Sequence, residues 1–387
     1  MSRKTRLLLV VNSDWFFLSH RLPLAVAARR AGVEVIVVAG DTGKSTTIVD
    51  QGFQFVRLPL SRASTNPITD ARTLLFLSRL YRRLRPDLVH HVTVKPIVYG
   101  SLAARLVGGF AVVNAVSGLA YTFSSDRLHA HVLRPLVTAL YRLALRDGSS
   151  RTIFQNPNDR DDLIRMRIVR PEQAVLIRGS GVDCSVFVPS PEPTGVPVVM
   201  LPARMLLEKG VKEFVEAARL LAASGCKARF VLVGDADPEN PGSISRAQLE
   251  EWVGQGSVEW WGHKPDMPSV LPQASVIVLP SYREGLPKVL LEAAACARPI
   301  VTTDVPGCRE VVRPGVDGLL VPARDARALA RAIETLVQSR TLRERYGSAA
   351  REIAVNEFAE EIVVRKTLAL YRDLLGDKWP KDSLSST

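Results

Sequence analysis

Short apolar runs rich in Val, Leu and Ile alternate with longer amphipathic stretches throughout the first half of the chain. The apolar runs have the composition of buried strands. The stretches at 18–31 and 70–85 repeat their apolar residues with the 3.6-residue period of a helix. Strands that alternate with helices predict a parallel sheet. The predicted strands of this half are residues 6–11, 33–39, 53–58, 87–92, 112–116, 152–155 and 174–177.

The same rhythm starts again after a proline-rich segment at 189–197, Pro-Ser-Pro-Glu-Pro-Thr-Gly-Val-Pro. Such a composition is typical of a linker. The pattern therefore predicts an α/β protein of two Rossmann-like domains, residues 1–190 and 191–358, joined by a hinge. The last segment, 359–377, carries a final amphipathic helix. In the second half the predicted strands are 198–201, 228–234, 258–261, 274–279 and one from 300 onward, and the predicted helices are 212–224, 245–254, 267–272, 286–297, 325–339 and 341–356.

Length and composition agree with two globular domains. A chain of 387 residues exceeds the usual size of a single hydrophobic core. The four cysteines form no Cys-x-x-Cys pair, which favours reduced thiols over disulfides or zinc. The apolar run near the N-terminus is short and leads into Asn12, which is typical of a first buried strand and not of a signal peptide. No stretch approaches the ~20 apolar residues of a membrane span, so we expect a cytoplasmic protein.

The net charge of +12 is concentrated in the first half. Residues 1–190 hold 26 basic and 13 acidic side chains, whereas the remainder holds 25 and 26. An anionic substrate or an anionic membrane surface accounts for such an excess. Nucleic acid is disfavoured, because the chain has no zinc-finger spacing and no RNP-type motif. The helix predicted at 70–85 carries five arginines, so it either lies on an anionic membrane or packs its apolar side on its own sheet, and the second alternative is favoured.

One stretch of the second half, residues 279–306, combines a strand end, a turn, a helix and the start of the next strand. The turn contains Glu284, and Pro287 follows in the first helical turn, where its missing N–H does no harm. Such a junction presents backbone N–H groups and the positive end of a helix, which predicts an anion site. A second strand end carries Arg204 and Lys209 just before a helix, and a guanidinium with an ammonium suits a dianionic group.

These motifs together resemble the donor site of retaining GT-B glycosyltransferases of the family 4 type. The resemblance rests on the Glu-x7-Glu pair of Glu284 and Glu292, preceded by Pro-Ser, and on the Ala-Arg…Glu-Lys-Gly segment at 203–210. It implies that Glu292 binds the ribose of a UDP-sugar and Glu284 the hexose, while Arg204 and Lys209 hold the diphosphate. It also implies further donor contacts from Gly262, His263, Gly285, Leu286, Pro287, Lys288 and Val289.

The first half is similar to one branch of this family, the bacterial capsule, O-antigen and N-glycan transferases that act on undecaprenyl-diphosphate-linked sugars. The segments that carry this similarity are 18–24, 95–96, 116–119, 154–156 and 181–189. The segment 121–134 mixes aromatic residues with two histidines and two arginines, which predicts a mobile acceptor loop. We also expect contacts to acceptor or phosphate from Lys95, His91, Gly118 and Ser13. Many relatives have a His-x-His sequence where this chain has His90, His91 and Val92. Either His91 acts, therefore, or no histidine does.

The resemblance implies a GT-B fold whose final helix crosses back to the first domain. It implies the transfer, with retention, of a hexose or N-acetylhexosamine from a UDP-sugar to a lipid-diphosphate-linked glycan. No metal or other cofactor is expected, because Arg204 and Lys209 supply the positive charge. We expect the protein on the inner face of the cytoplasmic membrane, as a peripheral protein. Two alternatives stay open: a UDP-sugar 2-epimerase on the same fold, and a non-catalytic partner that binds sugar nucleotides. A lack of the Gly-x-Gly-x-x-Gly motif after the first strand argues against a nicotinamide enzyme.

Overall fold

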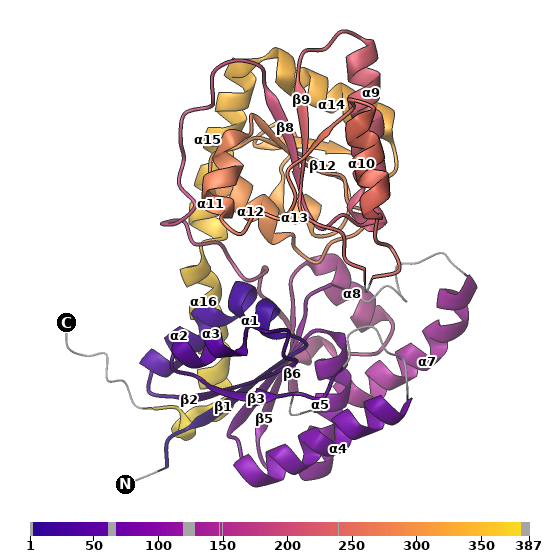
Figure 1. Ribbon diagram of the computed structural model, residues 1–387. Coiled ribbons are helices and arrows are strands. Elements are labelled where there is room, and N and C mark those ends of the chain that lie inside the picture. Colours follow the sequence, from indigo (N-terminus) through magenta and orange to yellow (C-terminus); the bar gives the residue numbers. More distant parts are fainter. Residues whose placement is uncertain are drawn as a thin grey trace, which may run out of the picture. The chain divides into compact units, whose positions relative to one another are not determined.

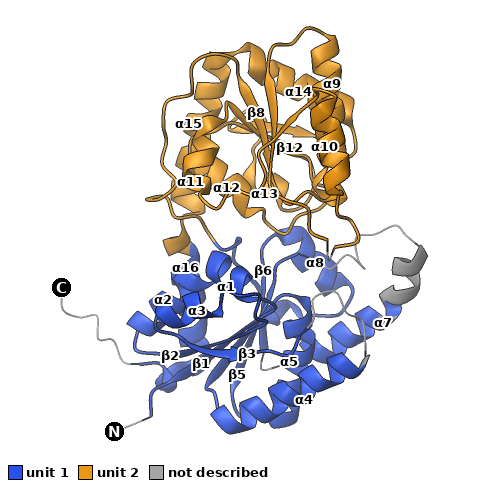
Figure 2. Ribbon diagram, viewed as in Figure 1, with its two compact units in different colours: residues 1–180, 363–387 blue, residues 181–362 orange. Residues whose placement is uncertain are grey.

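The computed structural model describes residues 3–60, 67–118, 128–146, 148, 150–238 and 240–380 (Figure 1). Its chain forms two compact units, coloured separately in Figure 2. Unit 1 comprises Met1–Ser180 and Val363–Thr387, and unit 2 comprises Gly181–Ile362. The division therefore falls ten residues before the boundary predicted at 190, and the C-terminal segment joins the first unit.

Unit 1 is built on a seven-stranded parallel sheet with the order β3-β2-β1-β4-β5-β6-β7. Its inner strands are buried along almost their whole length, which explains why they were visible in the sequence as continuous apolar runs. The strands are β1 Arg6–Val11, β2 Glu34–Ala39, β3 Gln54–Arg57, β4 Leu88–Val92, β5 Ala111–Val116, β6 Ser150–Phe154 and β7 Ala174–Leu176.

Helices cover both faces of this sheet, with α2, α3 and α16 on one side and α4, α5 and α7 on the other (Figure 1). Leu77, Leu80 and Tyr81 of α4 are buried against β1 and β2. The apolar side of this helix therefore packs on its own sheet, as favoured from the sequence. The helices are α1 Asp14–His20, α2 Leu22–Arg30, α3 Ser45–Asp50, α4 Pro67–Leu84, α5 Val94–Val107, α7 Leu128–Leu145, α8 Pro157–Arg165 and α16 Glu360–Leu375, with a 3-10 turn at Pro171–Gln173.

The helix predicted at 18–31 is two helices, α1 and α2, which meet at Arg21. Pro23 has no N–H, so the hydrogen bond to the carbonyl of Ser19 that would continue α1 cannot form. Asp14 begins α1, and its carboxylate accepts hydrogen bonds from the backbone N–H groups of Trp15, Thr42 and Lys44 at 2.7–2.8 Å. The break at Arg21 is therefore encoded locally, although the 3.6-residue period runs through it.

The C-terminal helix α16 contributes to the core of unit 1. Val363, Tyr371 and Leu375 are buried in the same cluster as Leu7 and Leu9 of β1, and Trp379 joins them after the helix. The crossing of the last helix to the first domain, implied by the resemblance, is confirmed.

Unit 2 has a six-stranded parallel sheet with the order β10-β9-β8-β11-β12-β13. The strand β13 was not predicted from the sequence, and a turn at residues 313–317 precedes it. The strands are β8 Val198–Pro202, β9 Arg229–Val233, β10 Glu259–Trp260, β11 Val276–Leu279, β12 Ile300–Thr303 and β13 Gly318–Val321. The helices are α9 Val211–Ala223, α10 Arg246–Gly254, α11 Met267–Val270, α12 Lys288–Ala295, α13 Cys308–Val311, α14 Ala326–Gln338 and α15 Arg340–Glu357, with 3-10 turns at Leu207–Lys209, Leu271–Gln273 and Gly376–Lys378, the last of them in unit 1.

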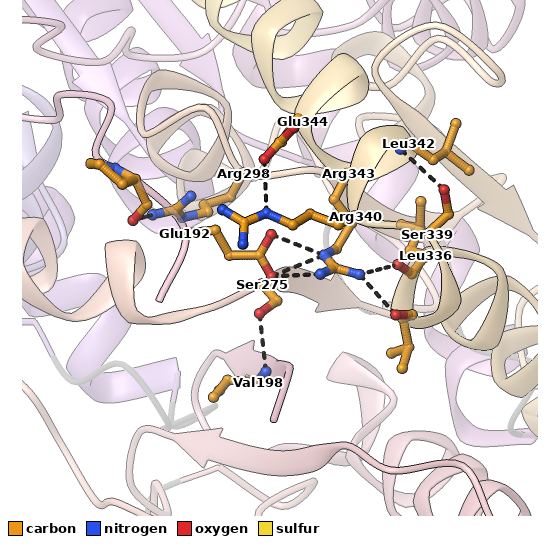
Figure 3. A network of polar contacts seen from close by, with 12 residues as sticks. Glu192, Val198, Ser275, Arg298, Leu336, Ser339, Arg340, Leu342, Arg343 and Glu344 are labelled. Atoms are coloured by element: carbon orange, nitrogen blue, oxygen red, sulfur yellow. Dashed lines mark hydrogen bonds and ion pairs between the residues drawn. The ribbon is translucent and has the colours of Figure 1, made fainter. Parts of the chain in front are cut away.

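The proline-rich segment 189–197 is anchored to unit 2 and is not the free hinge that its composition predicted (Figure 3). Glu192 forms a buried ion pair with Arg343 at 2.8 Å, and both side chains are less than 10% exposed. Arg298 donates from one guanidinium nitrogen to the carbonyl oxygens of Ser190 and Pro191, and also to Pro272, at 2.7–3.3 Å. Charges buried this deeply need their partners, so the segment is held in one conformation.

Candidate functional site

The loops at the carboxyl edge of the unit 2 sheet pack closely against one another at glycine positions. Gly210, Gly234 and Gly307 all have positive φ angles, which favour glycine over residues with a side chain. A Cβ atom on Gly210 would overlap the carbonyl of Pro280, and one on Gly234 would overlap the carbonyl of Ala203. One on Gly307 would lie 2.6 Å from the carbonyl oxygen of Glu284. The loops after β8, β9, β11 and β12 therefore contact one another through their backbones.

Two of the predicted catalytic residues, Lys209 and Glu284, meet at this edge. The ammonium of Lys209 donates to Oε1 of Glu284, and the hydroxyl of Ser281 donates to the same oxygen at 2.7 Å. Ser281 is fully buried, and its carbonyl accepts a hydrogen bond from the hydroxyl of Thr303 at the end of β12. One oxygen of the Glu284 carboxylate is thus held by two donors, one from the loop after β8 and one from the loop after β11.

The third predicted catalytic residue, Arg204, lies in the loop after β8 and pairs with Asp237 at 2.7 Å. Its side chain is 46% exposed, so the guanidinium remains open to a ligand. Asp237 follows β9, and its backbone N–H donates a hydrogen bond to the hydroxyl of Ser243 at 2.9 Å. Sequence reasoning missed Asp237, because nothing in the local pattern distinguishes it from an ordinary loop acid.

Glu292 lies in the second turn of α12, which has Pro287 as its N-cap and no acidic residue in its first turn. Burial raises the pKa of the Glu292 carboxyl above its usual value, and Lys288, 3.8 Å away, lowers it in part. A carboxylate held in a dry position at a helix start is ready to accept hydrogen bonds from a ligand that replaces its lost water. The same turn and helix start contain Gly285, Leu286 and Val289, as predicted from the sequence.

Gly262 and His263 follow the edge strand β10. The carbonyl of Gly262 accepts a hydrogen bond from the N–H of Gly234 at 2.8 Å, which ties this loop to the end of β9. His263 is exposed. Beside them lies a surface cavity of about 470 Å³ whose lining includes the side chains of Trp261, Lys264 and Asp266. The loop is therefore part of the same carboxyl edge as Arg204 and Glu284.

The residues predicted in unit 1 also follow strand ends, but His91 does not reach a ligand position. His91 is fully buried: Nδ1 bonds Oδ1 of Asn114 and Nε2 bonds the hydroxyl of Tyr81, both at 2.9 Å. Burial lowers the pKa of His91 to about 4, although the bond to Asn114 opposes this shift. Both ring nitrogens are occupied and the ring is neutral, so the geometry gives His91 a structural role.

Ser13, Lys95 and Gly118 follow β1, β4 and β5, three adjacent strands. Ser13 is buried. Lys95 forms an ion pair with Asp70 at 3.3 Å. Gly118 has a φ of +124° and ends the described segment. Of the acceptor loop predicted at 121–134, residues 121–127 lie outside the described residues, and residues 128–134 are not a loop but the first part of α7. No helix in the described part of the chain has the length and apolar character needed to cross a bilayer.

Two family descriptions match the chain, one on each unit. Residues 196–339 match "Glycosyl transferases group 1", and residues 6–156 match "Glycosyl transferase 4-like". The chain thus combines a glycosyltransferase 4-like domain with a group 1 glycosyltransferase domain. It is therefore an enzyme that transfers a sugar, and the carboxyl edge of unit 2 with its paired acids and cations is the candidate active site of this glycosyltransferase.

Curated relatives extend over nearly the whole glycosyltransferase chain. The N,N'-diacetylbacillosaminyl-diphospho-undecaprenol alpha-1,3-N-acetylgalactosaminyltransferase of Campylobacter jejuni is 29% identical over 376 residues, which is 92% of this chain and 97% of the relative. The UDP-Gal:alpha-D-GlcNAc-diphosphoundecaprenol alpha-1,3-galactosyltransferase of Escherichia coli is 24% identical and covers 89% of this chain and 90% of the relative.

Solved structures share the fold at lower identity. Sucrose-phosphate synthase from Thermosynechococcus elongatus superposes with a TM-score of 0.81 at 21% identity, over 97% of this chain and 100% of that one. Anabaena HepE in complex with UDP-glucose superposes with a TM-score of 0.72 at 18% identity, over 94% and 99% of the two chains. The GT-B architecture expected from the sequence is confirmed.

Proposed function

We propose that this glycosyltransferase moves a hexose or N-acetylhexosamine from a UDP-sugar to an undecaprenyl-diphosphate-linked saccharide, with retention of the anomeric configuration. Two relatives that span nearly the whole chain carry diphospho-undecaprenol acceptors in their names. The observation that carries the proposal is the contact of Lys209 with Glu284 at the carboxyl edge of the unit 2 sheet, the edge that also carries the pair of Arg204 and Asp237.

The donor would lie along this edge. Arg204 and Lys209 neutralise the diphosphate, since a lysine ammonium has three donors and Glu284 occupies one of them. Oε1 of Glu284 is held by Lys209 and Ser281, so Oε2, which has no partner among the described residues, accepts from a hexose hydroxyl. Glu292 accepts from the ribose hydroxyls, and these bonds offset the cost of keeping its carboxylate buried.

The reaction breaks the bond between the anomeric carbon and UDP and forms the bond to the acceptor hydroxyl on the same face of the sugar. The departing diphosphate takes the acceptor proton. No histidine is needed for this step, and His91 has both nitrogens occupied. Fixed positive charges aimed at the leaving group stabilise it without reorganisation. We propose that Arg204 and Lys209 do this without a metal, so that EDTA leaves the rate unchanged.

A lipid-linked acceptor requires work at a membrane surface, and we propose a peripheral location on the inner face of the cytoplasmic membrane. The exposed arginines Arg79, Arg82 and Arg83 of α4 attract anionic lipid. Replacing all three by Gln should reduce flotation with anionic liposomes, while Arg327→Gln with Arg331→Gln, two exposed arginines of unit 2, should not. Flotation that does not depend on anionic lipid would exclude this location.

The decisive experiment incubates the protein with a panel of UDP-sugars and an undecaprenyl-diphosphate-linked glycan. We expect one donor to yield a product whose new linkage has the anomeric configuration of the donor, read by NMR. Arg204→Met should lower turnover strongly, and Arg219→Met, an exposed arginine of α9, serves as control. Consumption of the UDP-sugar without acceptor, with an epimer as product, would identify an isomerase instead. Absence of UDP binding would refute the proposal.

A further inference from the structure

Unit 1 contains a buried arginine without a hydrogen-bond acceptor. Arg21, at the junction of α1 and α2, is 6% exposed, and its guanidinium forms no hydrogen bond with any described residue. Its Nε is fully enclosed. The neighbouring groups that interact with it electrostatically are His90 and Tyr371, which bond each other through Nδ1 and the hydroxyl. Nε2 of His90 is also enclosed and lacks a partner.

The two other buried arginines of the described chain have hydrogen-bond acceptors for their guanidinium groups, although Nε of Arg298 has none. Arg343 donates to the carboxylate of Glu192 and to two carbonyl oxygens at the end of α14, and Arg298 donates to four oxygens (Figure 3). A buried cation without such partners is costly. The protein therefore supplies acceptors to two of its buried guanidinium groups and none to that of Arg21, which indicates that the acceptor for Arg21 is a ligand.

The position of Arg21 agrees with a ligand site. His90 is the third residue of β4, which ends at Val92, so it lies two residues, about 7 Å, below the carboxyl edge of the sheet. Ligands of open α/β sheets bind at that edge. The nine-residue helix α2 begins directly after Arg21 and has no acidic residue in its first turn, so its positive end adds to the charge of the guanidinium. The His20-Arg21 pair is also part of the sequence similarity in this half, and the donor site makes no use of it.

We propose that Arg21 and Nε2 of His90 bind a phosphate group of a diphosphate ligand. With the Tyr371 hydroxyl donating to Nδ1, the proton of the neutral His90 ring is on Nε2 and can be donated. The planar guanidinium matches a phosphate with two parallel N–H bonds. The assignment of this phosphate to the lipid-linked acceptor rests on the proposed function, whereas the anion site itself does not.

The alternative is a structural role, in which the carboxyl end of α1 alone compensates the charge of Arg21. The two roles predict opposite effects of Arg21→Met. A structural arginine is stabilising, so its loss lowers the melting temperature and leaves anion binding unchanged. A ligand-binding arginine destabilises the protein while its ligand is absent, because its charge is buried without an acceptor. Its loss therefore leaves the melting temperature equal or higher and abolishes anion binding. Arg30→Met, an exposed arginine of the same helix, is the matched control for net charge.

The test titrates inorganic pyrophosphate into the full chain with UDP present at saturation, so that the donor site of unit 2 is occupied. We expect the pyrophosphate Kd of Arg21→Met to rise about tenfold or more, and that of Arg30→Met to stay at the wild-type value. A wild-type protein that binds no pyrophosphate under these conditions, or an Arg21→Met variant with an unchanged Kd, overturns the proposal.

A second arm measures transfer to a short-chain polyprenyl-diphosphate sugar. We expect Arg21→Met to raise the acceptor KM with little change in kcat. Arg21→Lys should raise the acceptor KM less, because the lysine ammonium keeps the charge but not the two parallel N–H donors of the guanidinium. An unchanged acceptor KM would assign the site to free phosphate and refute the acceptor role. Failure of the proposed function is read separately, as absence of UDP binding when UDP alone is titrated into the wild-type protein.

Discussion

The buried ion pair that anchors the proline-rich segment makes a quantitative prediction about stability. Arg343 donates to both oxygens of Glu192 at 2.8–3.1 Å and to the carbonyls of Leu336 and Val337 at 2.7 and 2.8 Å. Arg343→Met removes all of these interactions and leaves the carboxylate of Glu192 buried without a partner. Breaking a buried pair in this way costs about 3–5 kcal/mol of the free energy of unfolding.

For a unit of the size of Gly181–Ile362, this cost lowers the melting temperature by about 6–20 °C. We would follow thermal unfolding by circular dichroism and locate the effect by hydrogen exchange in peptides of 189–197, α14 and α15. Arg340→Met is the matched control, since its ion pair with Glu344 is more than half exposed on both sides. Its cost should be below about 1 kcal/mol.

The double variant Glu192→Gln with Arg343→Met tests the cause. It contains no unpaired buried charge, so it should be more stable than Arg343→Met alone. If the double variant loses the sum of the two single effects, or if Arg343→Met melts within a degree of Arg340→Met, the segment is not held by this pair and the reasoning is wrong.

Three further predictions concern the candidate site. Glu292→Gln should raise the free energy of unfolding at pH 7 and weaken donor binding. The folded-state pKa of Glu292 is raised, so the burial of its carboxylate costs stability above that pKa and costs nothing below about pH 4.5. In thermal melts at several pH values, the stability gained by the variant should therefore vanish as the pH falls to about 4.5. A variant less stable at pH 7 would contradict this. Ser281→Ala should lower turnover more than it lowers the affinity for UDP, which is measured by calorimetry. Ser281 orients the carboxylate of Glu284, which is proposed to bind the hexose, and UDP has no hexose. Equal losses of turnover and UDP affinity would count against that role. Gly210→Ala should destabilise unit 2 more than Gly225→Ala, since both have φ above +70° but only Gly210 abuts a carbonyl; equal melting temperatures would contradict the close contact.

The parallel sheets were predictable because their strands are buried on both faces and therefore appear as unbroken apolar runs. The helix α5 was not predicted. Gly100 in its middle and Pro96 in its first turn weaken the helical pattern. The structure explains Gly100, because a Cβ there would overlap the ring of His91. The glycine that weakens the helical pattern is thus explained by a contact that exists only in the folded chain.

The candidate site was predictable where a motif carries it and not where a partner comes from another loop. Arg204, Lys209, Glu284 and Glu292 were identified from spacing and resemblance, and the structure brings Lys209 and Glu284 into contact. Nothing in the sequence indicated that Asp237 pairs with Arg204. The same limit applies to the segment 189–197, whose composition predicted a free linker. Its partners lie about 110 and 150 residues further along the chain, beyond the reach of any local pattern.

The interlocked glycines of unit 2 have a consequence for changing the sugar that this enzyme selects. The loops after β8, β9, β11 and β12 each touch the backbone of a neighbour at a position with no space for a side chain. A loop grafted singly from a homologue would bring a backbone path shaped for a different neighbour. Transplanting the loops as one set, with their glycines, should preserve folding where single exchanges fail, so donor preference in this scaffold is better engineered by modules than by individual loops.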